Sequence, residues 1–227
     1  MKPQLYIIAG CNGAGKTTAS FTILPEVLDC KEFVNADEIA KGLSPFQPEK
    51  VAFEAGRIML SRVKALLAEG KTFAFETTLA TSSYGTLVKE AQQMGYEVSL
   101  LFLGLDSPEL AIDRVRERVA AGGHNIPEDV IRRRFIAGIR NLNEIYIPIV
   151  DAWMWMDNSQ LITTKIAEAK GRTEMTPQAD LDFSQKVTLG LNLSWNRLFT
   201  QRIRDDGTFV LSREGQIVTV KARDLQS

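Results

Sequence analysis

The sequence predicts an α/β fold in which a parallel sheet of five strands is followed by a smaller C-terminal helix and β-hairpin. Over the first two-thirds of the chain, short apolar runs alternate with amphipathic helical patterns, as in proteins built from strand–helix–strand units. A glycine-rich loop at residues 10–15 follows the first apolar run directly. Near residue 158 the alternation stops and the chain becomes more polar. We therefore expect a core over residues 1–158 and a docked appendage over residues 159–227.

Each predicted strand is a short apolar run bounded by polar or turn-forming residues. In order, these runs are residues 4–9, 31–35, 72–75, 97–103 and 151–156. The helical patterns between them cover residues 16–24, 48–69, 84–94, 108–121 and 128–146. Pro25 is expected to end the first helix, and Gly70 follows the second. Ser107 is expected to cap the helix that opens at Pro108.

The predicted appendage contains a helix at about residues 180–203 and a hairpin at about residues 208–220. Apolar residues recur at every fourth position along the helix: Phe183, Val187, Leu191, Trp195 and Phe199. Such a stripe is more often a packing face than a cofactor site. Because an isolated hairpin is only marginally stable in water, we expect the appendage to dock on the core.

The composition is that of an average soluble globular protein. Of 227 residues, 44% are hydrophobic and 24% charged, which excludes disordered and collagen-like classes, and the net charge of −1 provides no field for nucleic acid. The longest nearly apolar run, residues 98–105, is far shorter than the ~20 residues of a membrane helix. The first residues lead into a strand without a signal-peptide pattern. Cys11 and Cys30 form no CxxC pair, so neither a disulfide framework nor a zinc site is expected. We expect a cytoplasmic protein that binds neither nucleic acid nor membranes.

The loop at residues 10–17 fits the phosphate-binding pattern G-x-x-x-x-G-K-[ST] at every fixed position. Glycines let the backbone N–H groups turn inward around an anion, and the following helix N-terminus adds its dipole. Lys16 would reach the β- and γ-phosphates of ATP, and the Thr17 hydroxyl could ligate Mg²⁺. The alternative, an ordinary glycine-rich turn, is disfavoured by the strand before the loop and the helix after it. The expected ATP-binding residues are Gly10, Cys11, Asn12, Gly13, Ala14, Gly15, Lys16, Thr17 and Thr18. We interpret Cys11 as a tolerated small residue whose oxidation could block ATP.

Two acidic side chains follow neighbouring strands, where open α/β sheets bind their ligands. Asp37 follows the second strand and Glu76 ends the third. Either could act at a bound acceptor. For each residue a structural role is equally favoured: Asp37 could be the N-cap of a short helix at residues 38–41, and Glu76 could be a solvated strand end. Asp106 ends a run that resembles a Walker B strand, but its position before Ser107 favours helix capping. Glu76, or Asp37 through water, is therefore the favoured support for Mg²⁺.

Residues 113–134 carry six arginines against four acidic residues in an otherwise neutral chain. The arginines are Arg114, Arg116, Arg118, Arg132, Arg133 and Arg134. Positioned arginines stabilise the charge of a phosphoryl transition state, and residues 122–123 could serve as a glycine hinge between two lid helices. From charge alone, a solvated helix pair with internal salt bridges is the favoured alternative. A helical wheel through Ile131 and Phe135 places Arg133 opposite the buried stripe and Arg134 on its flank. His124 could touch a phosphate or base, or make a structural hydrogen bond.

Six short motifs occur in order with compatible spacing over residues 4–158. They are Gly10-x4-Gly15-Lys16-Thr17-Thr18, Val34-Asn35-Ala36-Asp37, Phe75-Glu76-Thr77-Thr78-Leu79, Arg118-Val119, Gly122-Gly123-His124 and Arg133-Arg134-Phe135. In these motifs the chain resembles the zeta toxin family of P-loop kinases. The resemblance implies strand order 2-3-1-4-5 and ATP-dependent phosphorylation of UDP-N-acetylglucosamine at its sugar 3′-hydroxyl. It also implies the possible presence of an antitoxin protein.

The resemblance assigns roles to individual residues. Asp37 falls on the catalytic aspartate and Lys16 on the Walker lysine. Glu76 and Thr78 fall on the substrate-binding pair, and Asn35 stands beside Asp37 in its motif. Arg118 and Arg134 become the expected lid arginines that contact phosphate, with Arg114 and Arg133 in reserve.

One departure keeps the acceptor open. Better-studied zeta toxins carry Glu-Gly-Thr-x-Arg after the third strand, whereas this chain has Glu76-Thr77-Thr78-Leu79-Ala80 and lacks the arginine. A kinase for a nucleoside or another sugar is therefore the first alternative. A nucleotide-binding protein without transfer activity is the second, although the intact Lys16, Thr17 and Asp37 argue against it.

Overall fold

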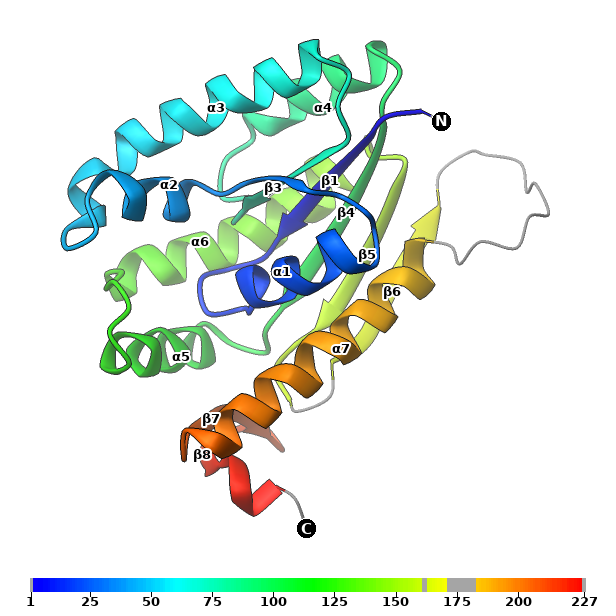
Figure 1. Ribbon diagram of the computed structural model, residues 1–227. Coiled ribbons are helices and arrows are strands. Elements are labelled where there is room, and N and C mark those ends of the chain that lie inside the picture. The colour runs from blue at the N-terminus through cyan, green and yellow to red at the C-terminus, as the bar shows by residue number, and fades with distance from the viewer. Residues whose placement is uncertain (1, 161–162, 171–182, 226–227) are drawn as a thin grey trace.

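The computed structural model describes residues 2–160, 163–170 and 183–225. A central six-stranded sheet runs in the order β2-β3-β1-β4-β5-β6 (Figure 1). Its strands are β1 (Gln4–Ala9), β2 (Glu32–Val34), β3 (Phe73–Thr77), β4 (Glu97–Gly104), β5 (Ala152–Asp157) and β6 (Thr164–Lys170). Strands β1 to β5 pair in parallel. The α/β class and the strand order 2-3-1-4-5 are confirmed.

The sixth strand is a correction to the predicted five-stranded sheet. Strand β6 pairs antiparallel with β5 at the sheet edge, with a register irregularity at Trp155/Met156. An edge strand needs a partner on one side only and can carry charged residues. Lys165 and Glu168 form an exposed ion pair on β6, and Ile166 is 53% exposed. This polar, solvated strand therefore lacks the apolar run on which the sequence prediction depended.

The helices follow the predicted order with shifted ends. They are α1 (Lys16–Glu26), α2 (Ala36–Leu43), α3 (Ala52–Ala68), α4 (Tyr84–Gln93), α5 (Pro108–Ala120), α6 (Glu128–Asn141) and α7 (Phe183–Arg204). A 3-10 turn (Pro48–Val51) precedes α3, and a π-helical turn (Leu142–Tyr146) follows α6. The prediction that Pro25 ends α1 is wrong. Pro25 lies in the last turn, and the Val27 N–H still bonds to the Ile23 carbonyl, so the proline removes only its own N–H from the helix.

Helices cover both faces of the sheet, as Figure 1 shows. Side chains alternate along each strand, so Tyr6 and Ile8 of β1 face one core while Leu5 and Ile7 face the other. The first core is completed by α1, α5 and α7, and the second by α3, α4 and the π-helical turn. Among the described helices, none has the length and apolar character to span a membrane.

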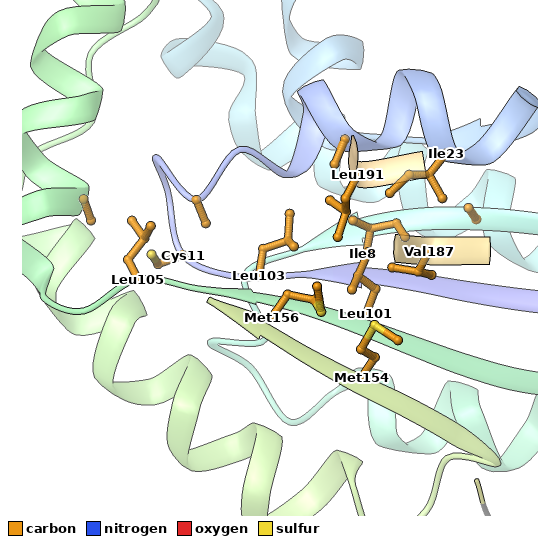
Figure 2. Close-up of a cluster of buried hydrophobic side chains, with 14 of the residues drawn as sticks. Ile8, Cys11, Ile23, Leu101, Leu103, Leu105, Met154, Met156, Val187 and Leu191 are labelled. Atoms are coloured by element: carbon orange, nitrogen blue, oxygen red, sulfur yellow. The ribbon is translucent and has the colours of Figure 1, made fainter. Parts of the chain in front are cut away.

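The C-terminal helix packs directly on the core. Val187 and Leu191 of α7 are buried beside Ile8 and Ile23 (Figure 2). A Cβ added at Gly190 would lie 2.6 Å from the Ile23 Cγ1, so the glycine permits this close approach. The expected start of the helix at residues 180–182 lies outside the described residues.

The predicted hairpin is also present. Strands β7 (Thr208–Arg213) and β8 (Gln216–Lys221) pair antiparallel, and a short 3-10 turn (Ala222–Leu225) follows. The buried Phe209 of β7 contacts Trp195 and Phe199 of α7, with ring centroids 4.9 Å and 6.0 Å apart. Thus the first part of the apolar stripe packs on the core, and the second part packs on the hairpin.

Candidate active site

The phosphate-binding loop connects the end of β1 to the start of α1. Gly13 and Gly15 have φ values of 80° and 83°, a left-handed conformation that favours glycine. Helix α1 begins at Lys16 with Gly15 as its N-cap, so the first N–H groups of the helix open toward the loop. The Asn158 Nδ2, just beyond β5, donates to the Ala14 carbonyl at 2.9 Å. The loop is therefore held in an anion-binding conformation by the neighbouring strand end.

Lys16 is held inside this loop. Its Nζ donates to the Cys11 carbonyl at 3.0 Å and lies 3.6 Å from the Glu76 Oε1. Both the Lys16 and Glu76 side chains are only 8% exposed. Burial raises the pKa of Glu76, and the nearby Lys16 ammonium and Thr17 hydroxyl oppose that rise. Glu76 is therefore a buried carboxylate at the centre of the site, and the solvated strand-end alternative is wrong.

The residues around Thr17 fit a magnesium ion. The Thr17 hydroxyl lies 3.1 Å and 3.0 Å from the two Glu76 carboxylate oxygens. Hydroxyl, carboxylate and phosphate oxygens are the ligands that Mg²⁺ prefers, usually with several waters retained. Within the described part of the chain, no group of three or more His, Cys, Asp or Glu residues could hold a metal ion by itself. The donor set thus suits an ion that shares its coordination with a bound phosphate.

Asp37 lies in the first turn of α2, but it is not the helix N-cap. The N-cap is Asn35, whose Oδ1 accepts hydrogen bonds from the Asp37 and Glu38 N–H groups at 2.8 Å and 3.4 Å. The Asn35 Nδ2 donates to the Glu76 Oε2 at 3.0 Å. Asn35 thereby links the two acidic residues, and the exposed Asp37 side chain has no capping role. The capping alternative for Asp37 is wrong.

Of the two expected phosphate-contacting arginines, Arg134 contacts the phosphate-binding loop and Arg118 lines the cavity beside it. Arg134 of α6 donates from Nη1 to the Asn12 Oδ1 at 3.1 Å. Arg118 of α5 donates from Nη2 to the His124 carbonyl at 3.2 Å, and its buried Nε has no partner within the described residues. Burial is the larger cause of a lowered pKa of His124, and the nearby positive charge of Arg118 lowers it further. Arg133 points to solvent, as the helical wheel predicted.

The other arginines of the lid segment make structural contacts. The Arg114 guanidinium donates to the carbonyls of Val210, Asn158 and Ser159 at 2.9, 2.8 and 3.1 Å, and so joins α5 to β7 and to the end of β5. Arg116 pairs with Asp113 and Glu128, and Arg132 pairs with Glu109. The salt-bridged alternative therefore describes Arg116 and Arg132.

The remaining candidates have simpler surroundings. Ser107 caps α5, as predicted, by accepting from the Leu110 N–H at 3.2 Å, so Asp106 is not the N-cap. Cys11 is buried, and burial raises the pKa of its thiol to about 11. The Thr78 hydroxyl accepts from the Ala80 N–H at 3.4 Å within the turn after β3.

A cavity of 330 Å³ runs beside the loop and joins several of these residues. Its walls include Asn12, Gly13, Gly15, Lys16, Thr17, Thr18, Asp37, Glu76, Arg114, Arg118 and His124. This volume lies within the range of small-molecule sites. Thr78, Asn35 and Arg134 lie outside the described lining. Lys41, Asn158 and residues of the appendage complete the walls and were not predicted from the sequence. Asn158 could have been found, because it directly follows a parallel strand.

The parallel sheet, the loop conformation and the buried lysine define the molecule as a kinase-like P-loop protein. The family model described as Zeta toxin matches residues 1–152, and the chain belongs to the zeta toxin family. The family resemblance in the sequence motifs is thereby confirmed.

Solved structures share the fold. A structure from the PezAT chromosomal toxin–antitoxin system of Streptococcus pneumoniae is 21% identical, with a TM-score of 0.56 over 87% of this chain and 86% of that one. A structure of AvrRxo1-ORF1:-ORF2 with ATP is 16% identical, with a TM-score of 0.59 over 86% of this chain and 78% of that one. In sequence, the chain is also similar to an uncharacterised protein of Haemophilus influenzae, 30% identical over 137 residues, or 60% of this chain and 94% of the relative.

Proposed function

We propose that the protein is an ATP-dependent kinase that phosphorylates a hydroxyl group of a nucleotide sugar such as UDP-N-acetylglucosamine. The observation that carries the proposal is a single cavity lined by Lys16, Thr17, Glu76 and Asp37. These residues supply a phosphate cation, oxygen ligands for a metal and a carboxylate for the acceptor. Membership of the zeta toxin family supports the same reaction class.

The proposed reaction transfers the γ-phosphoryl group directly. The acceptor oxygen bonds to the γ-phosphorus while the bond to the β–γ bridging oxygen breaks and ADP leaves. The loop N–H groups and Lys16 hold the phosphates. Thr17 and Glu76 would hold Mg²⁺, which neutralises charge on the phosphate oxygens when bound.

Asp37 is the proposed base. A carboxylate is too weak a base to ionise a sugar hydroxyl beforehand, so Asp37 aligns the hydroxyl and takes its proton as the bond to phosphorus forms. Arg118 and Arg134 are proposed to stabilise the transferred phosphoryl group. Asn35 positions Asp37 and Glu76 through its two hydrogen-bonding ends, and Thr78 is the proposed further contact to the acceptor.

A kinase for a different hydroxyl acceptor is the second candidate. The observation that favours it is Ala80, which stands where better-studied zeta toxins carry an arginine. An arginine is suited to binding diphosphate, so its absence bears on the acceptor and leaves the phosphoryl-transfer residues unaffected.

The test is incubation with ATP, Mg²⁺ and a panel of UDP-sugars, nucleosides and free sugars, with mass detection of phosphorylated products. A phosphorylated UDP-sugar that Lys16→Ala protein does not form would support the first candidate. Product from another acceptor alone would favour the second. Absence of any product, with intact ATP binding, would contradict the kinase proposal.

We also propose an antitoxin protein as a partner, in keeping with the family. If the chain acts as a toxin, its expression alone should arrest growth of a bacterial host, and the Lys16→Ala variant should not. Unimpaired growth with active soluble enzyme would contradict this role.

A further inference from the structure

The appendage forms one wall of the cavity beside the phosphate-binding loop. Trp195 and Leu198 of α7 and Phe209 of β7 line this wall, and Arg202 borders it. Trp195 is half-buried, while Phe209 is buried behind it with ring centroids 4.9 Å apart. The Arg202 guanidinium lies 5.8 Å from the Phe209 ring centroid and 3.5 Å from the Glu117 carboxylate. The wall is therefore an aromatic surface with a polar edge.

The wall is held at a set position relative to the loop. The Ser194 hydroxyl donates to the Thr18 carbonyl at 3.1 Å, which ties α7 to the first turn of α1. The Arg114 Nε donates to the Val210 carbonyl at 2.9 Å, which ties β7 to α5. Burial of Val187 and Leu191 in the core also holds α7 in place. The aromatic surface is thus positioned before any ligand binds.

Two parts of the cavity differ in chemistry. The carboxylates of Asp37, Glu38 and Glu76, on α2 and β3, line one part of the cavity and suit a hydroxyl-bearing acceptor. The aromatic and aliphatic side chains of α7 and β7 line another part. A nucleotide whose phosphates occupy the loop must extend its nucleoside toward one part. A planar, uncharged base suits the aromatic part, since bases stack favourably on aromatic rings.

We infer that the C-terminal appendage forms the nucleobase-binding wall of the nucleotide site, with Trp195 as the stacking residue. The inference rests on the proposed function, because it takes the loop as the phosphate site. It assigns to the second half of the apolar stripe a binding role in addition to packing. Trp195 then acts as a specificity-determining residue for nucleotides over inorganic polyphosphates.

The test compares binding of ATP and inorganic tripolyphosphate, each with Mg²⁺, by calorimetry. Trp195→Leu keeps apolar bulk but removes the stacking surface. We expect ATP binding to weaken roughly 5- to 150-fold while tripolyphosphate binding stays unchanged. Phe199→Leu is the matched control, since Phe199 belongs to the same aromatic cluster and lies outside the described cavity lining. It should bind both ligands as the wild type does.

Tryptophan fluorescence provides a second measurement, which can be made on the wild-type protein without any substitution. ATP should alter the emission of the wild-type protein, and tripolyphosphate should not. Trp195→Phe should abolish this change in emission, because the remaining tryptophans, Trp153 and Trp155, lie on β5. The variant should retain most of the ATP affinity, because a phenyl ring can still stack on the base.

Three results would overturn the inference. Unchanged ATP affinity in folded Trp195→Leu protein would place the base elsewhere. Equal loss of ATP binding in Phe199→Leu would show a packing effect and no stacking contact. If the wild type binds neither ATP nor tripolyphosphate, the proposed function itself fails and the inference fails with it.

Discussion

The Arg134 guanidinium of α6 donates a hydrogen bond to the Asn12 side chain of the phosphate-binding loop, with Nη1 3.1 Å from Oδ1. This contact joins a lid residue to a loop residue 122 positions earlier in the chain. Burial lowers the pKa of Arg134, but the nearby Asp37 carboxylate opposes that shift. The guanidinium therefore contacts the loop and is also near enough to the proposed base, Asp37, to interact with its charge.

Replacement of Arg134 by alanine should slow phosphoryl transfer by on the order of 10³-fold, because a positioned arginine stabilises the transition-state charge. The measurement is kcat with saturating ATP and acceptor. Arg133→Ala is the matched control, since Arg133 is the neighbouring arginine of the same helix and its side chain is exposed to solvent. Similar kcat values for the two variants would refute a catalytic role for Arg134.

Asp37→Asn should retain ATP binding and lose transfer. Loss of a general base typically lowers the rate 10²- to 10⁴-fold, or about 3–5 kcal/mol. Folding should change little, because the N-cap of α2 is Asn35 and Asp37 is exposed. ATP affinity and product formation are to be measured on the same preparation. As a control, Glu54→Gln removes a first-turn carboxylate from α3 and should have no effect on either. Near-normal turnover in Asp37→Asn protein would show that Asp37 is not the base.

Gly190→Ala should lower the melting temperature even though alanine favours a helix by about 1 kcal/mol. The added Cβ would lie 2.6 Å from the Ile23 Cγ1 and 3.2 Å from the Ile23 Cα, so α7 would have to move away from α1. Overpacking of this kind costs about 1–3 kcal/mol.

The matched control for this change is Gly56→Ala in α3, where an added Cβ meets no described atom within 4 Å. We expect that variant to gain about 0.5–1 kcal/mol. Thermal unfolding measures both proteins. A melting temperature for Gly190→Ala at or above that of the wild type would contradict the tight contact between α7 and α1.

Native Cys11 and Cys30 should resist alkylation near neutral pH. Burial raises the pKa of each thiol to about 11, so little thiolate exists at pH 8, and the rate should increase as the pH approaches 11. Iodoacetamide labelling followed by mass spectrometry should show slow modification of the folded protein and rapid modification of both sites in denaturant. Rapid labelling of Cys11 in the folded protein would contradict this protection and show a reactive thiol in the loop.

Alanine at Arg114 should mainly destabilise the protein. It removes three hydrogen bonds that join α5 to β7 and to the end of β5, and it leaves buried carbonyls without those donors. We expect a loss of about 2–4 kcal/mol in the free energy of unfolding, measured by urea denaturation. An unchanged urea midpoint would show that the contact does not stabilise the appendage.

The local features of this protein could be predicted from the sequence because short stretches of chain determine them. The loop at residues 10–17 needs only glycines that adopt positive φ, a lysine and a hydroxyl, bounded by a strand and a helix. The exposure of Arg133 followed from helical periodicity alone. The strand order, in contrast, was predicted from the resemblance to the zeta toxin family.

The tertiary structure decided which of several similar residues has which contact. Arg114 and Arg118 share a helix face, yet Arg114 binds carbonyls of Asn158, Ser159 and Val210 while the Arg118 Nε has no described partner. Charge and spacing are nearly equal for the two, so only the folded chain separates them. The same reason applies to Trp195, which the four-residue repeat predicts as part of a packing face. A helical repeat indicates which side chains share a face of the helix. Whether each of them contacts the core, the hairpin or an open cavity depends on the surface that packs against that face.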